Sequence, residues 1–276
     1  MQLRFSKMHG LGNDFVVIDL VSQNAKLSAD HIRFIADRHR GIGCDQVLLI
    51  EPPHTADTDF HYRIFNCDGN EVEQCGNGAR CFGKFITDKK LSGKKTLNVS
   101  TKGGLIRIDI LDRDTVRVDM GVPQFDPANI PFNAEAKAKS YRIAHSQGES
   151  DISVVSMGNP HAILLVDAVD TAAVQTLGPI LEAHERFPER ANIGFMQIES
   201  RSKIKLRVFE RGVGETCACG SGACAAVAAG INNGHLDPRV EVALRGGNLT
   251  IEWQGENASL VMTGDAKKVF DGKIKL

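Results

Sequence analysis

The chain has 276 residues, of which 42% are hydrophobic and 24% are charged, and its formal net charge is −1 at pH 7. This composition is that of an ordinary globular protein with apolar material for one large or two medium domains. The near-zero charge argues against nucleic acid or an anionic membrane as a partner, because such binding depends on concentrated Lys and Arg.

Secreted and membrane-spanning classes are also disfavoured. The first fifteen residues lack the apolar stretch of a secretory signal, and no apolar run approaches the ~18 residues of a membrane span. Seven cysteines, an odd number placed unevenly, fit reduced thiols better than a secreted disulfide framework. We therefore expect a cytoplasmic protein with no membrane partner.

The predicted elements alternate between short strands and a few helices. In the first half, β-branched or alternating runs predict strands at 15–19, 46–50, 96–100, 105–110 and 116–120. Helices are predicted over 28–40, with Ser28 as N-cap, and over 76–90. A stretch at 121–150 with Pro123, Pro127 and Pro131 predicts a weakly structured connector. The second half repeats the helices at 171–186 and 220–234.

The two halves are copies of one pattern. "YRIFNCDGNEVEQCGNGARC" (62–81) and "LRVFERGVGETCACGSGAC" (206–224) share a frame in which Cys75 and Cys219 each open Cys-Gly-x-Gly-Ala. Three further pairs of segments match at a nearly constant offset: 12–19 with 158–167, 41–51 with 191–200, and 103–121 with 246–264. We expect an α+β fold of two pseudo-symmetric domains, each a curved, mostly antiparallel sheet or barrel around a central helix. Residues 1–120, joined by 265–276, form the first domain, residues 121–264 form the second, and the active site is expected in a cleft between them.

Cys75 and Cys219 precede glycines and a predicted helix. The first N–H groups of a helix are unpaired and partly positive, so a helix N-terminus attracts a carboxylate or stabilises a thiolate. A thiolate base and a thiol acid suit the removal of a proton from one face of a carbon acid and its return to the other. This pattern indicates a racemase or epimerase that needs no pyridoxal phosphate.

Other uses of the cysteines are less consistent with the spacing. A single Cys-Gly-x-Gly is more often a buried small apolar residue beside a turn, but two symmetric copies reverse that preference. No CxxC occurs, which disfavours a zinc site or a dithiol oxidoreductase. We expect no metal and no cofactor, and we interpret the other five cysteines as packing residues: Cys44, Cys67, Cys81, Cys217 and Cys224.

The motifs "MHGLGNDFVVID", "NCDGNEVEQCGNGARC", "MGNPHA", "ERFPERANIGF" and "ERGVGETCACGSGACAA" together closely resemble the diaminopimelate epimerase family over essentially the whole chain. The resemblance implies an α+β fold of two pseudo-symmetric halves, usually a homodimer. It implies the cofactor-independent interconversion of LL- and meso-2,6-diaminopimelate in bacterial lysine and cell-wall synthesis. Phe270 lies where family members often have an aromatic residue at the dimer contact.

The resemblance also assigns roles to individual residues. The catalytic thiols fall on Cys75 and Cys219, and His161 with Glu210 matches the pair thought to assist them. The substrate contacts implied are Asn13, Gln46, Asn66, Gly76, Asn77, Asn159, Asn192, Glu210, Arg211, Gly220 and Ser221. The guanidinium of Arg211 can bind the distal carboxylate, at the end of diaminopimelate that is not inverted, through two parallel hydrogen bonds. Taken singly, Asn13 and Asn159 fit turns equally well, Gln46 and Asn192 would be routine polar residues, and His161 is more often structural than catalytic.

Two other functions stay open. A proline or hydroxyproline racemase would use the same two-thiol chemistry, but its substrates lack the second charged end that Arg211 and the asparagines would bind. A non-thiol isomerase of the phenazine-biosynthesis type, or a binder of small metabolites, would not need the cysteine pair that this chain has. Cys217 is a third thiol near Cys219, at a variable position of its motif.

Overall fold

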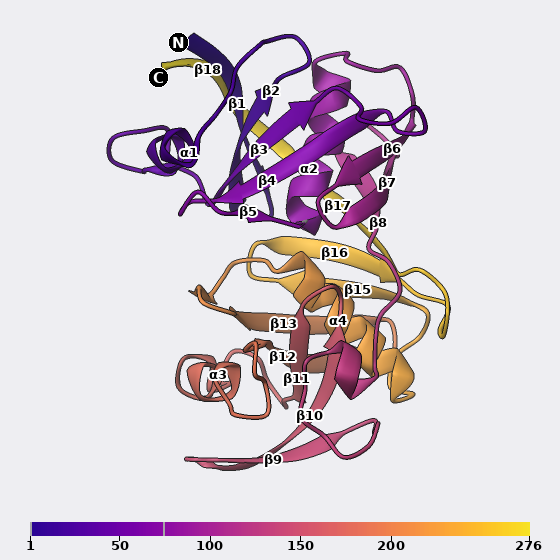
Figure 1. The fold of residues 1–276 in the computed structure, drawn as a ribbon. Helices are drawn as coiled ribbons and strands as arrows, with labels where there is room; N and C mark the ends of the chain where they lie inside the picture. The colour runs from indigo at the N-terminus through magenta and orange to yellow at the C-terminus, as the bar shows by residue number, and fades with distance from the viewer. Residues whose placement is uncertain (1, 74) are drawn as a thin grey trace. The chain divides into compact units, whose positions relative to one another are not determined.

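The repeat predicted from the sequence appears in the computed structural model, which describes residues 2–73 and 75–276. Two compact units are formed (Figure 1). The N-terminal unit contains residues 1–119 and 263–276, and the C-terminal unit contains residues 120–262. The final segment of the chain therefore belongs to the unit in which the chain begins.

The sheet of the N-terminal unit is mostly antiparallel, as predicted. Its strands pair in the order β18–β1–β2–β3–β4–β6–β7–β8, with parallel pairs at β2–β3 and β4–β6, and β5 forms a hairpin with β4. The strands are β1 (Gln2–Gly10), β2 (Asn13–Asp19), β3 (Gln46–Glu51), β4 (Phe60–Asn66), β5 (Glu71–Val72), β6 (Thr96–Thr101), β7 (Gly104–Ile110), β8 (Thr115–Asp119) and β18 (Lys267–Lys275). β17 (Val261–Asp265) leads the chain back into this unit.

Two helices accompany these strands. In α1 (Ala29–Ala36) the Ser28 hydroxyl accepts a hydrogen bond from the His31 N–H, and the His31 ring accepts one from the Ser28 N–H. This capping box confirms Ser28 as the N-cap. The second helix, α2 (Gly76–Asp88), contacts β1, β2, β3, β7, β8 and β18 and is buried along most of its length (Figure 1). The central helix predicted at the Cys-Gly-x-Gly-Ala turn is confirmed.

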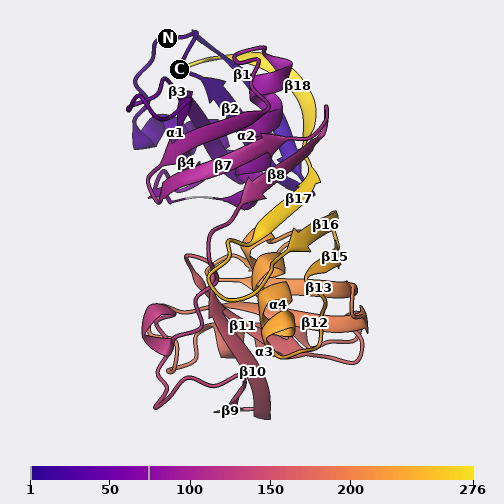
Figure 2. The same ribbon diagram turned by 90° about the vertical axis from the view of Figure 1, so that its right-hand side faces the viewer.

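The C-terminal unit repeats this arrangement. Its strands pair in the order β9–β10–β11–β12–β13–β15–β16, and the parallel pairs β11–β12 and β13–β15 occupy the positions of β2–β3 and β4–β6. The strands are β9 (Tyr141–His145), β10 (Gly148–Ser156), β11 (Pro160–Leu165), β12 (Asn192–Ser200), β13 (Lys203–Glu210), β14 (Gly214–Glu215), β15 (Arg239–Leu244) and β16 (Gly247–Glu252). Helix α3 (Val174–Glu182) corresponds to α1, and α4 (Gly220–Asn232) contacts β10, β11, β12, β13 and β16 (Figure 2).

The prediction of a weakly structured connector over 121–150 is wrong for its second part. Residues 141–150 form β9 and the start of β10, which pair as a hairpin. Before them, the short 3-10 helix η1 (Pro127–Asn129) leads into Ile130 and Phe132, which pack with Tyr141 and Ile143 in the core of the C-terminal unit. The prolines indicate turns, but the alternating apolar residues at 141 and 143 favour a strand with one face in the core.

The interpretation of five cysteines as packing residues holds for three of them. Cys44, Cys81 and Cys224 are buried, whereas Cys67 and Cys217 are exposed. Cys67 lies in the turn between β4 and β5, and Cys217 lies between β14 and α4. Of the helices in the described part of the chain, none is long and apolar enough to span a membrane.

Candidate active site

The two predicted catalytic cysteines occupy equivalent places in the two units. Cys75 is the N-cap residue of α2 and Cys219 is the N-cap residue of α4, both with extended backbone angles. Each side chain therefore lies at the positive end of a helix dipole, where negative charge on sulfur is stabilised. The same two positions bring the first backbone N–H groups of each helix, from Gly76 and Gly220 onward, beside the sulfur.

The surroundings of Cys219 favour a thiolate. Its Sγ accepts a hydrogen bond from the Gly222 N–H at 3.4 Å, and the Ser221 hydroxyl lies 3.6 Å away. A Cβ at position 222 would lie 3.2 Å from this sulfur and 3.0 Å from Val208, so a side chain there would crowd the thiol. The Cys219 side chain is buried, which by itself opposes ionisation, so the Gly222 N–H and the helix dipole are the groups that stabilise a thiolate here.

The surroundings of Cys75 are different. Its thiol donates to Asn13 Oδ1 at 3.8 Å, and Asn77 Nδ2 donates to the same oxygen at 3.2 Å. Asn13 Nδ2 donates in turn to Asp45 Oδ2 at 3.0 Å. Because a carboxylate only accepts hydrogen bonds, Asp45 fixes which end of the Asn13 amide faces the thiol. An amide oxygen directed at sulfur favours the protonated thiol over the thiolate.

A network of charges holds Asp45 in place. Arg38 bridges Asp45 and Asp14 with contacts of 2.8 Å to each, and Lys7 lies 2.5 Å from Asp14. Burial alone would raise the pKa of Asp14, but the hydrogen bonds from Arg38 and Lys7 hold it well below its usual range. This network is not among the features predicted from the sequence. The available signal was the acidic residue beside each of two predicted site residues, in "GND" and "CDQ".

The remaining predicted residues of the N-terminal unit lie at one end of the β3–β4 hairpin. Gln46 and Asn66 are directly opposite in the antiparallel register, and Gln46 Nε2 donates to Asn66 Oδ1 at 2.9 Å. Phe15 pairs with Gln46 across the parallel β2–β3 ladder, so Asn13 at the start of β2 comes from the same end of the sheet. The fold thus gathers Asn13, Gln46 and Asn66 on adjacent strands.

In the C-terminal unit, the predicted residues lie at the starts of β11 and β12. His161 and Asn192 are partners in this parallel ladder, and Asn159 Oδ1 lies 2.9 Å from His161 Nε2. Asn192 is buried, with its Nδ2 donating to the Pro160 carbonyl and its Oδ1 accepting from the Arg211 N–H, both at 3.0 Å. Asn192 therefore fixes the backbone that carries Arg211.

His161 is neutral at physiological pH. It is fully buried, and burial together with the nearby charge of Arg211 lowers its pKa to about 3. Because the Asn159 oxygen can only accept, the ring proton is on Nε2, and Nδ1 is the unprotonated nitrogen. A catalytic role for this ring is therefore limited to that of a neutral imidazole.

Glu210 is the last residue of β13, and Arg211 follows it. The Glu210 carboxylate accepts a hydrogen bond from the Thr216 hydroxyl. The Arg211 side chain is exposed, and one of its nitrogens donates to the Glu189 carbonyl at 3.0 Å. The rest of this guanidinium faces solvent, where it is able to meet an anionic group of a ligand.

A second feature missed from the sequence supports both cysteine loops. Arg63 forms a two-pronged ion pair with Glu71 at 3.0 and 2.8 Å, and Arg207 forms the same pair with Glu215 at 2.7 and 3.0 Å. The first pair joins β4 to β5, which precedes Cys75, and the second joins β13 to β14, which precedes Cys219. The two arginines align in the repeat, and a glutamate follows each of them by eight residues.

Comparison with known proteins agrees with this geometry. The family model described as "Diaminopimelate epimerase" matches residues 5–125 and 153–269. A probable proline racemase from Agrobacterium radiobacter is 16% identical, with 99% of this chain and 93% of that chain covered and a TM-score of 0.74. A hydroxyproline epimerase from Agrobacterium vitis is 16% identical, with 99% and 92% covered and a TM-score of 0.71. A PhzF-family phenazine biosynthesis protein from Bacillus anthracis is 16% identical, with 100% of each chain covered and a TM-score of 0.71. These structures share the fold, and the predicted fold class is confirmed.

Proposed function

Because this chain belongs to the diaminopimelate epimerase family, a family of epimerases, we propose that it interconverts LL- and meso-2,6-diaminopimelate, a step of lysine and peptidoglycan synthesis. The observation that carries the proposal is the pair of cysteines, Cys75 and Cys219, each the N-cap of the central helix of its unit. The proposed reaction is inversion at one α-carbon without a cofactor.

The proposed chemistry uses one sulfur as base and the other as acid. Cys219, with its Gly222 N–H and the helix dipole, starts as the thiolate and removes the α-proton. Cys75, whose thiol donates to Asn13, starts protonated and delivers a proton to the opposite face. The α C–H bond breaks and its electron pair stays on carbon until the new C–H bond forms. In the reverse direction the two roles exchange.

The carboxylate of the reacting end needs donors that strengthen as negative charge develops. The first N–H groups of α2, at Gly76 and Asn77, and of α4, at Gly220 and Ser221, are fixed donors of this kind. We assign to His161 and Glu210 the assisting role that the family resemblance implies. His161 takes part as a neutral ring, in keeping with its low pKa.

Selection of diaminopimelate requires recognition of the end that does not react. Arg211 supplies a guanidinium for the distal carboxylate, and the amides of Asn66, Asn159 and Asn192 supply donors and acceptors for the polar groups. A site built to bind these groups discriminates strongly against a substrate that lacks them. Proline and hydroxyproline have no second charged end, so they are the second candidates.

The test of substrate is a direct comparison. Reduced protein is incubated with LL-diaminopimelate, L-proline and trans-4-hydroxy-L-proline, and the stereoisomers are separated by chromatography. The proposal predicts the meso isomer from the first substrate and no inversion of the other two. Arg211→Lys should lower kcat/KM by about 10- to 150-fold, since a hydrogen bond to a charged group contributes about 1.5–3 kcal/mol. The control Arg201→Lys, at an exposed arginine paired with Asp237, should leave kcat/KM unchanged. Inversion of proline would contradict the proposal.

The family resemblance also supports a homodimer in a reducing compartment, the cytoplasm. Phe270 and Val269 on β18 are exposed large apolar side chains, as expected for residues at a contact between copies. Both proposed catalysts are thiols, which a reducing cytoplasm preserves. Analytical ultracentrifugation of the reduced protein tests the first part, with sedimentation as a monomer as the contrary result.

A further inference from the structure

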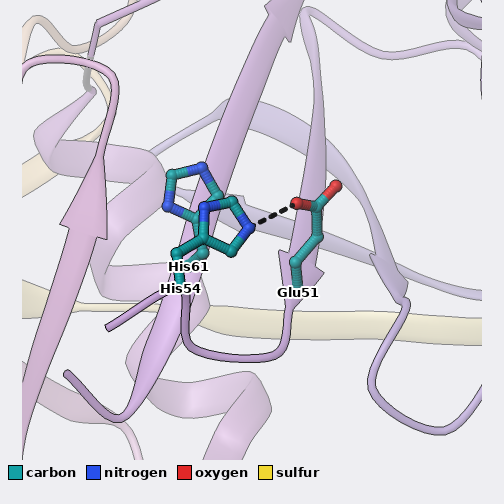
Figure 3. Close-up of side chains that lie close together, drawn as sticks. All are labelled: Glu51, His54 and His61. Carbon is teal, nitrogen blue, oxygen red and sulfur yellow. Dashed lines mark ion pairs between the residues drawn. The ribbon is translucent and has the colours of Figure 1, made fainter. Parts of the chain in front are cut away.

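A group of titratable side chains lies at the far end of the β3–β4 hairpin from Gln46 and Asn66. Glu51 ends β3, His61 is its antiparallel partner on β4, and His54 is in the loop that joins the strands. Ligand atoms from these three residues all lie within 4.8 Å of one another. Figure 3 shows the two imidazole rings beside the carboxylate. Imidazole and carboxylate ligands suit Zn²⁺ and related divalent transition metals.

His61 presents a ring nitrogen in the state that a metal requires. Its Nδ1 lies 2.8 Å from Ser100 Oγ, and that hydroxyl donates its own proton to the Phe60 carbonyl at 3.4 Å. In the tautomer in which Nδ1 donates to this hydroxyl, Nε2 has the lone pair that a metal needs. A hydrogen bond of this kind behind a metal-binding histidine orients the ring and strengthens the ligand.

The two carboxylate oxygens of Glu51 have different neighbours. Arg63 donates to Oε1 at 3.3 Å, while Oε2 lies 3.5 Å from His54 Nε2. The guanidinium of Arg63 is shared with Glu71 in a two-pronged pair. Glu51 Oε2, opposite the oxygen that accepts from Arg63, is therefore the one available to a divalent cation.

His54 is the adjustable ligand. Its side chain is 56% exposed, and its ring stacks on that of His61 with centroids 3.8 Å apart and an angle of 21° between the planes. A metal lies in the plane of each imidazole that binds it, so the two rings must leave this stack for both to coordinate. With bonds of about 2.0–2.1 Å in a tetrahedral site, ligand atoms lie about 3.4 Å apart. Rotation of the exposed His54 ring brings its nitrogen closer at small cost.

We propose that Glu51, His54 and His61 form a three-ligand site for Zn²⁺ or a similar divalent transition metal, with water as the fourth ligand. The metal cross-links the loop between β3 and β4, and its effect is on the stability of the N-terminal unit. Gln46 and Asn66 lie at the opposite end of the same hairpin, so the metal takes no part in the proposed epimerase chemistry. This inference stands independently of the proposed substrate.

Cobalt(II) is the probe that distinguishes this site from the cysteines. The full chain, without a histidine tag and with its thiols reduced, is titrated with Co²⁺ while absorption is recorded. Nitrogen and oxygen ligands give visible d–d bands, whereas thiolate ligands add near-ultraviolet charge-transfer bands. We expect one Co²⁺ per chain, d–d bands without thiolate charge transfer, and a higher melting temperature of the bound protein.

Variants then identify the ligands. His54→Ala and His61→Ala should each weaken binding by at least about tenfold, and Ser100→Ala by about 10- to 100-fold through the supporting hydrogen bond. The control His235→Ala changes an exposed histidine of the other unit and should bind Co²⁺ like the wild type. Three results would each overturn the site. They are a failure to observe saturable binding, the presence of thiolate charge-transfer bands, and an affinity in His54→Ala equal to that of the wild type. His54 is exposed, so its variant should fold whatever happens to His61→Ala.

Discussion

Replacing His161 should change how the stability of the C-terminal unit depends on pH. The ring is buried with a pKa of about 3, whereas a histidine in an unfolded chain has a pKa of about 6.5. Between these values the unfolded chain binds a proton that the folded chain does not. The contribution of the neutral His161 ring to the free energy of unfolding is therefore fully present above pH 6.5, and it is lost as pH falls below that value. From pH 7 to pH 5 the loss amounts to about 2 kcal/mol at 1.36 kcal/mol per pH unit.

His161→Gln provides the comparison, because a glutamine amide is able to donate toward Asn159 and has no proton to gain. The only tryptophan of the chain, Trp253, is buried in the same unit and reports its unfolding by fluorescence. Urea unfolding curves at pH 5, 6, 7 and 8 give the free energy of unfolding for both proteins. We expect the wild type to lose about 2 kcal/mol more than the variant between pH 7 and pH 5. Parallel pH profiles for the two proteins would refute the neutral buried imidazole.

Three further predictions test the site and its framework. In Asp45→Asn the remaining oxygen can stay with Arg38, so an NH₂ group replaces the oxygen that accepts from Asn13, and kcat/KM should fall by about tenfold, the equivalent of one charge-assisted hydrogen bond of about 1.5 kcal/mol. Cys217→Ser should leave kcat/KM unchanged in the reduced protein, because the proposed chemistry needs no third thiol. Gly178→Ala places a Cβ 2.7 Å from the ring of Phe209, so it should destabilise the protein by about 1–2 kcal/mol in thermal unfolding, after the gain in helix propensity.

Matched variants separate these effects from general damage. Asp167→Asn changes an exposed carboxylate outside the site and should leave kcat/KM unchanged. Gly93→Ala adds a Cβ with nothing within 4 Å and should not lower the melting temperature. Equal kcat/KM for Asp45→Asn and the wild type would show that Asp45 has no positioning role. A large loss of activity in Cys217→Ser would place that thiol in the chemistry, and an unchanged melting temperature for Gly178→Ala would contradict the packing around Phe209.

The sequence predicted the features that repeat. The alignment of Cys75 with Cys219 located both helix starts, and the strand patterns on either side indicated a mostly antiparallel α+β fold. The prediction was weaker for residues 141–150, because a short hairpin between prolines has a less regular pattern than a repeated motif. The alternation at Tyr141 and Ile143 was present, but only the packing around Ile130 and Phe132 shows which face it covers.

The hydrogen-bond partners and the burial of the site residues could not be predicted from the sequence. Asp45 is adjacent to the predicted Gln46, yet its role depends on the parallel pairing of β2 with β3, which brings it to Asn13. The burial of His161 and the resulting fall in its pKa likewise depend on residues far along the chain. Long-range contacts of this kind are set by sheet register, which a local pattern of residues does not specify.

The most direct test of the two-thiol proposal is the fate of solvent deuterium. Reduced wild type, Cys75→Ala and Cys219→Ala are incubated with LL-diaminopimelate in D₂O, and the α-carbons are followed by NMR together with the meso product. The proposal predicts inversion with deuterium at one of the two α-carbons in the wild type, and loss of inversion in both variants. Inversion that persists in either variant, or the absence of both exchange and inversion in the wild type, would contradict it.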